Sequence, residues 1–143
     1  NKEETKQFPQ KVMAWIGIMD LKSGELFYIN ANADSPAIKK DGQFRILEDK
    51  EDAILMADEG FKEYCIQMRE GDRLFLYTDG ISEAAGGTSG MFGTDRMLDA
   101  LNSEPDADVR KVIENVQERL SGFCGNSHRK SWTKSWTPAA TRC

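Results

Sequence analysis

A run of apolar residues near the start of the chain is not broken by alternating polar ones. In residues 12–19, VMAWIGIM, apolar residues occupy both alternating sets of positions, which is typical of a strand covered on both faces. We therefore expect a central strand there. The turn residues LKSG and a second strand-like run, ELFYIN, come next. Residues 12–30 thus predict an antiparallel hairpin.

Two further hairpins are predicted downstream. Asp41-Gly42, a strong hairpin-turn signal, stands between Ile38 and Phe44. This hairpin is more polar than the first, so we expect it at the edge of a sheet. The runs EYCIQM and RLFLYT, joined by residues 69–72, predict a third hairpin. The acidic stretch 48–60 shows no clean period, and we expect a loop there.

The second half of the chain changes to helical spacing. After the break at Asp79-Gly80, glycines and a serine in residues 86–90 predict a surface loop. Thr94 is placed to cap a short helix, and Ser103 and Pro105 to open a longer one that ends at Gly122. Five apolar residues share one face of the longer helix: Val109, Val112, Ile113, Val116 and Leu120.

Strands followed by helices predict an α+β domain in which an antiparallel β-sandwich is layered with helices. Seven side chains are expected to lie in adjacent central strands with little exposed surface: Trp15, Ile16, Ile18, Leu74, Phe75, Leu76 and Tyr77. The charged residues of the longer helix, Arg110, Lys111, Glu114 and Glu118, should face solvent.

Charge is unevenly distributed along the chain. The formal net charge is -5, yet all 24 acidic residues lie before residue 124. Four basic residues lie after it: Arg129, Lys130, Lys134 and Arg142. The main part of the chain is therefore more acidic than the total implies. Such a surface repels phosphate backbones, which argues against nucleic-acid binding.

Residues 126–143 differ in kind from the rest. They contain no acidic residue, no aliphatic period and a near-repeat, KSWTKSWT. We therefore divide the chain into residues 1–125, a portion of one domain, and residues 126–143, a tail that we interpret as non-native or disordered. Deleting the tail is expected to leave the melting temperature nearly unchanged.

Cysteine usage and hydropathy indicate a cytoplasmic protein. Cys65, Cys124 and Cys143 are odd in number and lack CxxC spacing, so we expect free thiols in a reducing compartment. No signal peptide and no apolar run of about 18 residues is present in the sequence. We expect no direct membrane contact from this segment.

The strand-like run 74–78 leads directly into Asp79-Gly80. A carboxylate at that place is either a turn residue or a ligand for a hard cation such as Mg²⁺ or Mn²⁺, and spacing alone favours the turn. Asp72 and Glu83 are candidates for supporting a metal ligand, although a turn and a helix-start role explain them as well. No second histidine or CxxC pair accompanies His128, so a metal-ligand role is not indicated for it. Cys65 is interpreted as a core thiol and not as a nucleophile.

GDRLFLYTDGISEA (71–84), followed by MFGTDRMLDAL, resembles the SpoIIE/RsbU-like branch of the PPM (type 2C-like) metal-dependent serine/threonine phosphatases. The upstream GIMDLKSGELFYINA matches that branch too. The resemblance implies two antiparallel sheets packed face to face with helices outside. It also implies that Asp79 is a metal ligand and catalytic residue for two Mn²⁺ or Mg²⁺ ions. It further implies an anti-anti-sigma (STAS-type) phosphoprotein substrate, and a sensor or receiver domain upstream.

The sequence departs from the family pattern in several places. The family's G-G-D segment and its Asp-Asp-[IV]-[TS] strand are absent, so we expect the C-terminal part of the domain only, with weak metal binding and no appreciable turnover. Residues 30–36 read NANADSP where relatives show Asn-Ala-Gly-His-Asn-Pro-Pro. These losses keep two alternatives open: a non-catalytic module that binds a protein partner, and a structural domain in which Asp79 is only a turn residue.

Overall fold

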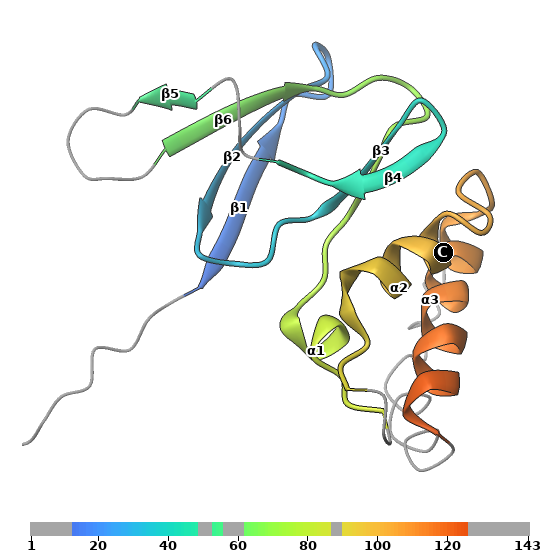
Figure 1. Ribbon diagram of the computed structural model, residues 1–143. Coiled ribbons are helices and arrows are strands. Elements are labelled where there is room, and N and C mark those ends of the chain that lie inside the picture. Colours follow the sequence, from blue (N-terminus) through green and yellow to red (C-terminus); the bar gives the residue numbers. More distant parts are fainter. Residues whose placement is uncertain (1–12, 49–52, 56–61, 87–89, 126–143) are drawn as a thin grey trace, which may run out of the picture. The chain divides into compact units, whose positions relative to one another are not determined.

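The computed structural model describes residues 13–48, 53–55, 62–86 and 90–125 (Figure 1). The chain divides into two compact units. The first is formed by the chain up to residue 35 together with residues 48–69, and the second by residues 36–47 together with the chain from residue 70 onward. Each unit contains its own β-sheet.

The first unit holds a four-stranded antiparallel sheet. Its strands are β1 (Ala14–Met19), β2 (Glu25–Ala31), β6 (Lys62–Gln67) and β5 (Ala53–Leu55), in the order β1-β2-β6-β5. The hairpin predicted for residues 12–30 is confirmed over its described part. The expectation of a loop over residues 48–60 was wrong at β5. The sequence there gives no strand period because β5 is only three residues long.

Local chemistry fixes the first turn. The Asp20 carboxylate accepts hydrogen bonds from the backbone N–H groups of Lys22 (2.8 Å) and Ser23 (3.3 Å). Gly24 then adopts φ 76°, a left-handed conformation that glycine takes without steric cost. On one face of the sheet, the Tyr28 ring stacks on Trp15 and on Tyr64, with centroid distances of 5.3 and 5.2 Å. The turn and this aromatic row together set the strand register.

The prediction that β1 is a buried central strand was wrong for the described residues. β1 is the outermost strand of its sheet and pairs there with β2. Ile16 is 55% exposed and Ile18 is 73% exposed. An apolar run on both faces shows that a strand can be covered, but the cover comes from other segments that the pattern does not specify.

The second unit holds a three-stranded antiparallel sheet with the order β4-β3-β7, formed by β3 (Ala37–Lys40), β4 (Gln43–Ile46) and β7 (Arg73–Phe75). The hairpin predicted around Asp41-Gly42 is confirmed. Both turn residues have positive φ, 51° and 81°, as a two-residue hairpin turn of type I′ requires. β4 lies at the sheet edge as expected, whereas β3 is central and largely buried.

The third predicted hairpin was wrong. β6 and β7 belong to different sheets, and β7 pairs with β3 through the register Ile38↔Leu74. Residues 69–72 therefore carry the chain from one sheet to the other instead of closing a hairpin. β7 also ends at Phe75, and Leu76 is 57% exposed, contrary to its predicted burial. Strand pattern identifies the strands, but pairing depends on contacts that are distant in sequence.

Three helices follow: α1 (Asp79–Ser82), α2 (Gly93–Leu101) and α3 (Val109–Cys124). The predicted starts were displaced. The cap of α2 is Phe92 instead of Thr94. The cap of α3 is Asp108, whose carboxylate accepts a hydrogen bond from the N–H of Arg110 at 2.9 Å, so Ser103 and Pro105 lie in the preceding turns. α3 continues through Gly122 and ends before Gly125, whose φ is 75°.

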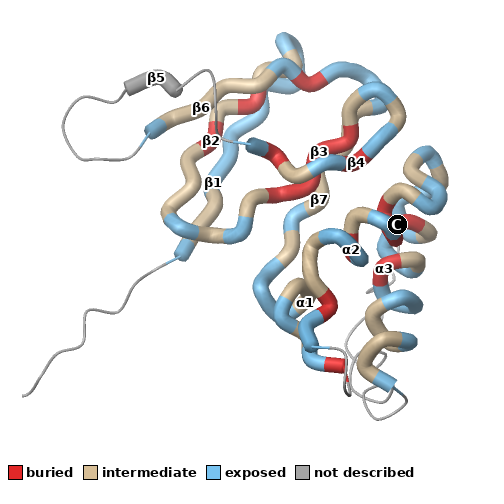
Figure 2. Tube along the Cα trace, viewed as in Figure 1, coloured by how far each residue is buried: buried red, intermediate tan, exposed pale blue. Residues whose placement is uncertain are grey.

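The core of the second unit lies between its helices and its sheet (Figure 2). Eight buried residues form it: Ala37, Phe44, Phe92, Met97, Ala100, Leu101, Val112 and Val116. Val112 and Val116 are buried and Leu120 packs at the margin, as predicted. Val109 and Ile113 are exposed, contrary to prediction. Arg110, Glu114 and Glu118 face solvent as expected, whereas Lys111 is half-buried.

Polar side chains join the α2–α3 connection to the sheet. The buried Lys39 ammonium donates hydrogen bonds to the Asp106 carboxylate and to the Gly71 carbonyl, the latter at 3.2 Å. The Arg73 guanidinium donates to the carbonyls of Pro105 and Ala107, at 3.1 and 2.5 Å. The buried cation is therefore paired, which avoids the penalty of an isolated buried charge.

Removing the Asp106 charge should weaken the fold in a pH-dependent way. The hydrogen bond from Lys39, together with its charge, holds the pKa of Asp106 below its ordinary value of 3.8. A lowered pKa contributes stability that is present above the ordinary value and is lost as the pH falls through the folded value. We expect Asp106→Asn to lower the urea midpoint at pH 7, by an amount that shrinks below pH 3.8.

Urea titrations at several pH values measure this difference. Asp99→Asn is the matched control, because Asp99 is an exposed aspartate of α2. It should leave the midpoint unchanged at every pH. A deficit in Asp106→Asn that stays constant down to the most acidic pH would contradict the electrostatic explanation.

Candidate functional site

Asp79 stands on the solvent side of a segment that is fixed by its neighbours. The chain leaves β7 at Phe75, and Asp79 is the first residue of α1. The side chains of Tyr77 and Ile81 pack against the core of the second unit, and the Tyr77 ring stacks on Phe75 with a centroid distance of 6.2 Å. Thr78, Asp79 and Gly80 are exposed. The inward side chains on both sides therefore hold the Asp79 carboxylate toward solvent.

Backbone hydrogen bonds close the turn around Asp79. The N–H of Ile81 donates to the Thr78 carbonyl at 3.0 Å, and the N–H of Glu83 donates to the Asp79 carbonyl at 2.7 Å. A Cβ placed on Gly80 would come no nearer than 3.4 Å to its neighbours, at the Thr78 hydroxyl oxygen. The described residues therefore leave space for a side chain at Gly80, and glycine keeps this space open beside the carboxylate.

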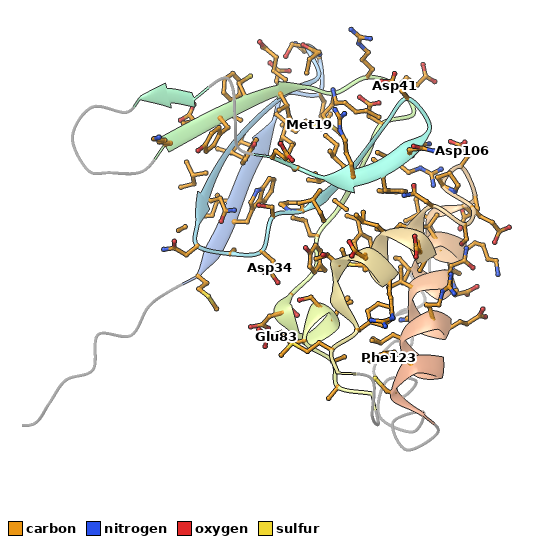
Figure 3. The ribbon with its side chains drawn as sticks, in the orientation of Figure 1. Met19, Asp34, Asp41, Glu83, Asp106 and Phe123 are labelled. Carbon is orange, nitrogen blue, oxygen red and sulfur yellow. The ribbon has the colours of Figure 1, made fainter. Side chains whose placement is uncertain are left out.

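Of the remaining candidates, Glu83 lies one helical turn after Asp79, whereas Asp72 does not lie beside it. Asp72 precedes β7 while Asp79 follows it, so the two residues lie at opposite ends of that strand. Asp72 pairs with Lys40 at 3.6 Å. Glu83 is exposed at the end of α1 (Figure 3). Cys65 is half-buried in β6 of the first unit, so it lies less deeply than the core thiol that was predicted. His128 lies outside the described residues.

The described part of the chain does not contain a complete metal site. Within it, no group of three or more His, Cys, Asp or Glu side chains could hold a metal ion. Magnesium and similar hard cations need several oxygen ligands in a defined geometry. The single carboxylate of Asp79 is of the right chemical type and is accessible, but it supplies one ligand only.

The altered segment 30–36 keeps an ordered conformation. Asn32, at the position where the family pattern named above has glycine, has φ 57°, a left-handed conformation in which asparagine is the best tolerated side chain after glycine. The Asn30 amide oxygen accepts a hydrogen bond from the N–H of Ala33 at 2.9 Å. Asparagine therefore supplies the left-handed backbone conformation at this position without a glycine.

The comparisons with known proteins identify the family of the chain. The family described as stage II sporulation protein E (SpoIIE) matches residues 2–130. The chain belongs to the SpoIIE family. Protein IcfG from Synechocystis sp. is 26% identical over 115 residues, which are 79% of this chain and 18% of that protein. The chain thus spans less than a fifth of that curated relative.

Two solved structures share the fold. One contains the RsbU and RsbW domains of Rv1364c from Mycobacterium tuberculosis, with a TM-score of 0.64 and 25% identity over 80% of this chain and 33% of that chain. The other is the phosphatase domain of the cell fate determinant SpoIIE from Bacillus subtilis, presoaked with Mn, with a TM-score of 0.59 and 16% identity over 80% of this chain and 50% of that chain.

These matches confirm the predicted fold class and the predicted family. The chain has the mixed sheets and helices of a SpoIIE/RsbU phosphatase domain, of which it forms a part. The division at residue 125 stays a prediction, as does the interpretation of residues 126–143, which lie outside the described residues, as a non-native or disordered tail. No helix in the described ranges is both long and apolar enough to cross a membrane.

Proposed function

We propose that the intact protein containing this chain is a PPM-type serine/threonine protein phosphatase in which Asp79 is a catalytic metal ligand. The observation that supports this most directly is the exposed Asp79 carboxylate, held at the start of α1 between two inward-packed side chains, in a chain of the SpoIIE family. A rigid support of this kind is what a ligand requires, because small displacements lower affinity and rate.

The proposed cofactors are two Mn²⁺ or Mg²⁺ ions. Proteins of this family are generally metal-dependent, and one solved relative was presoaked with Mn. Asp79 is the ligand that the described residues contribute, and we assign the other carboxylates to parts of the protein beyond them. On this proposal the present chain alone binds metal weakly, because one carboxylate cannot replace enough of the water around the ion.

The proposed substrate is a phosphorylated anti-anti-sigma protein of the STAS type, in the cytoplasm. The resemblance to the RsbU-like branch supports this class of substrate, and so does the likeness to a structure that joins RsbU and RsbW domains. The same resemblance supports an upstream sensor or receiver domain that controls the phosphatase. The acidic character of the chain gives no support to a nucleic-acid partner.

Phosphate release tests the proposal. The intact protein should release phosphate from a phosphoserine STAS protein in the presence of Mn²⁺ and should stop when EDTA is added. The present chain alone should show no appreciable turnover under the same conditions. Absence of Mn²⁺-dependent release by the intact protein, with correct folding shown by circular dichroism, would remove the phosphatase assignment.

The second candidate is a non-catalytic module that binds a protein partner. Segment 30–36 favours it, because its backbone is kept in order while Ala33 replaces the histidine of relatives. This module should bind a STAS protein, measured by isothermal titration calorimetry, while releasing no phosphate from it. Phosphate release from a bound STAS protein therefore distinguishes the two candidates: the phosphatase releases it and the binding module does not.

A further inference from the structure

The segment that follows Asp79 is closed by short-range contacts at its base. The N–H of Phe92 donates to the Ala84 carbonyl at 2.8 Å, and the N–H of Gly86 donates to the Gly90 carbonyl at 3.0 Å. Ala85 also pairs with Met91 as an antiparallel bridge. Residues 84–86 and 90–92 therefore form a tied base that joins the end of α1 to the start of α2.

This base packs against the Phe123 side chain of α3. Gly86 is buried, and a Cβ added to it would lie 2.5 and 2.6 Å from two ring carbons of Phe123 and 2.6 Å from the Phe123 carbonyl oxygen. Those distances are shorter than real Cβ contacts. Glycine is thus required at position 86 by close packing, since it adds no side chain between the two backbones.

The Phe123 ring is itself fixed from two further directions. It packs edge-on against the fully buried Phe92 with a centroid distance of 5.6 Å. The Arg96 guanidinium lies over the ring, 4.8 Å from its centroid, and donates to the carbonyls of Met91 and Phe92 at 3.1 and 2.9 Å. Phe123, near the end of α3 (Figure 3), therefore occupies a defined place in the second unit.

A continuous series of contacts leads from this ring to Asp79. The ring contacts Gly86, and the base that contains Gly86 is hydrogen-bonded at Ala84. From Ala84 the chain runs back through Glu83 and α1 to Asp79. The last link is the hydrogen bond between the Glu83 N–H and the Asp79 carbonyl. A shift of the base away from Phe123 would be transmitted to that hydrogen bond.

We propose that Gly86 and Phe123 are positioning residues for Asp79, so that the last turns of α3 set where the Asp79 carboxylate stands. Neither residue touches the proposed reaction centre. Their effect passes through the backbone of α1. The part of this inference that concerns turnover rests on the proposed phosphatase function, whereas the part that concerns the contact does not.

Amide hydrogen exchange on the chain tests the contact directly. Gly86→Ala should accelerate exchange of the Glu83 and Phe92 amides by at least about tenfold, because both hydrogen bonds open locally. The Val112 amide, bonded to the Asp108 carbonyl at 3.0 Å in the same unit, is the internal reference and should keep its rate. Unchanged rates at Glu83 and Phe92, or equal acceleration at Val112, would overturn the proposal.

Turnover by the intact protein is the second measurement. Gly86→Ala should lower kcat by at least about tenfold, because a small displacement of the Asp79 carboxylate from its working position is enough to slow the reaction. Gly122→Ala is the matched control: this α3 glycine has open space where its Cβ would lie, and the variant should keep the wild-type rate. In a Phe123→Leu background, Gly86→Ala should cost less than it does alone, as expected of residues in contact.

Amide exchange and turnover together distinguish a failure of the proposed phosphatase function from a failure of the positioning role. No Mn²⁺-dependent release by the wild-type intact protein would refute the proposed function, while the exchange rates would still decide whether the contact holds α1. Wild-type turnover in folded Gly86→Ala protein, or additive effects of the two substitutions, would refute the positioning role.

Discussion

Replacing Asp79 with asparagine in the intact protein is expected to lower Mn²⁺-dependent phosphate release by about a hundredfold or more, because a metal contributes several kcal/mol of charge stabilisation and each 1.4 kcal/mol is about tenfold in rate. Asparagine keeps the shape of the side chain but removes the negative charge that a hard cation requires. Since Asp79 is exposed and belongs to no ion pair that would be broken within the described residues, the fold should remain intact.

The rate is measured with a phosphoserine STAS protein over a range of Mn²⁺ concentrations. Asp95→Asn is the matched control, because Asp95 is likewise an exposed aspartate in the first turn of a helix of the same unit. It should retain the wild-type rate. Equal rates in wild type and Asp79→Asn would remove Asp79 from the mechanism. No activity in either would favour the binding module.

Hairpins closed by short turns were predictable from the sequence, and longer-range pairing was not. The turns at Asp20–Gly24 and at Asp41-Gly42 are decided by hydrogen bonds and φ values of adjacent residues. β7 has an equally strong strand pattern, but its partner is β3, which lies more than thirty residues earlier. Nothing in the local pattern distinguishes that partner from β6, which is nearer in sequence.

The start of α3 was predicted wrongly because several residues are suited to cap a helix there. Ser103, Pro105 and Asp108 are all suited to the start of α3, and the structure assigns the cap to Asp108. Asp106 meanwhile pairs with Lys39, and Arg73 binds the carbonyls around it. These contacts hold the preceding turns outside the helix, and they depend on β3 and β7, which helix periodicity does not take into account.

Asp79 was found by resemblance and not by spacing, since an Asp-Gly turn after a strand is common. The structure adds what holds this residue in place: Tyr77 and Ile81 packed inward on either side, and the base seated on Phe123. Gly86 reads in the sequence as an ordinary loop glycine. Its constraint becomes visible only when α3 is placed against it, because the contact joins residues far apart in the chain.

Truncating Phe92 to alanine is expected to destabilise the second unit by about 3 to 5 kcal/mol, the usual cost of removing a buried phenylalanine side chain. Phe92 is 0% exposed and packs with Met97, Leu101 and Val116 in one cluster, as well as edge-on against Phe123. A domain has only about 5 to 15 kcal/mol of total stability. The variant should therefore lose a large share of the stability of the unit that carries α1 and Asp79.

Chemical denaturation with circular dichroism measures the loss. Met91→Ala is the matched control: Met91 is the adjacent residue but is 62% exposed, and truncation there should change the free energy of unfolding by no more than about 0.5 kcal/mol. A Phe92→Ala variant as stable as Met91→Ala would mean that this cluster is not the core of the unit. If Phe92→Ala loses this stability as expected, the fully buried ring at the start of α2 is confirmed as a main part of the core of the second unit.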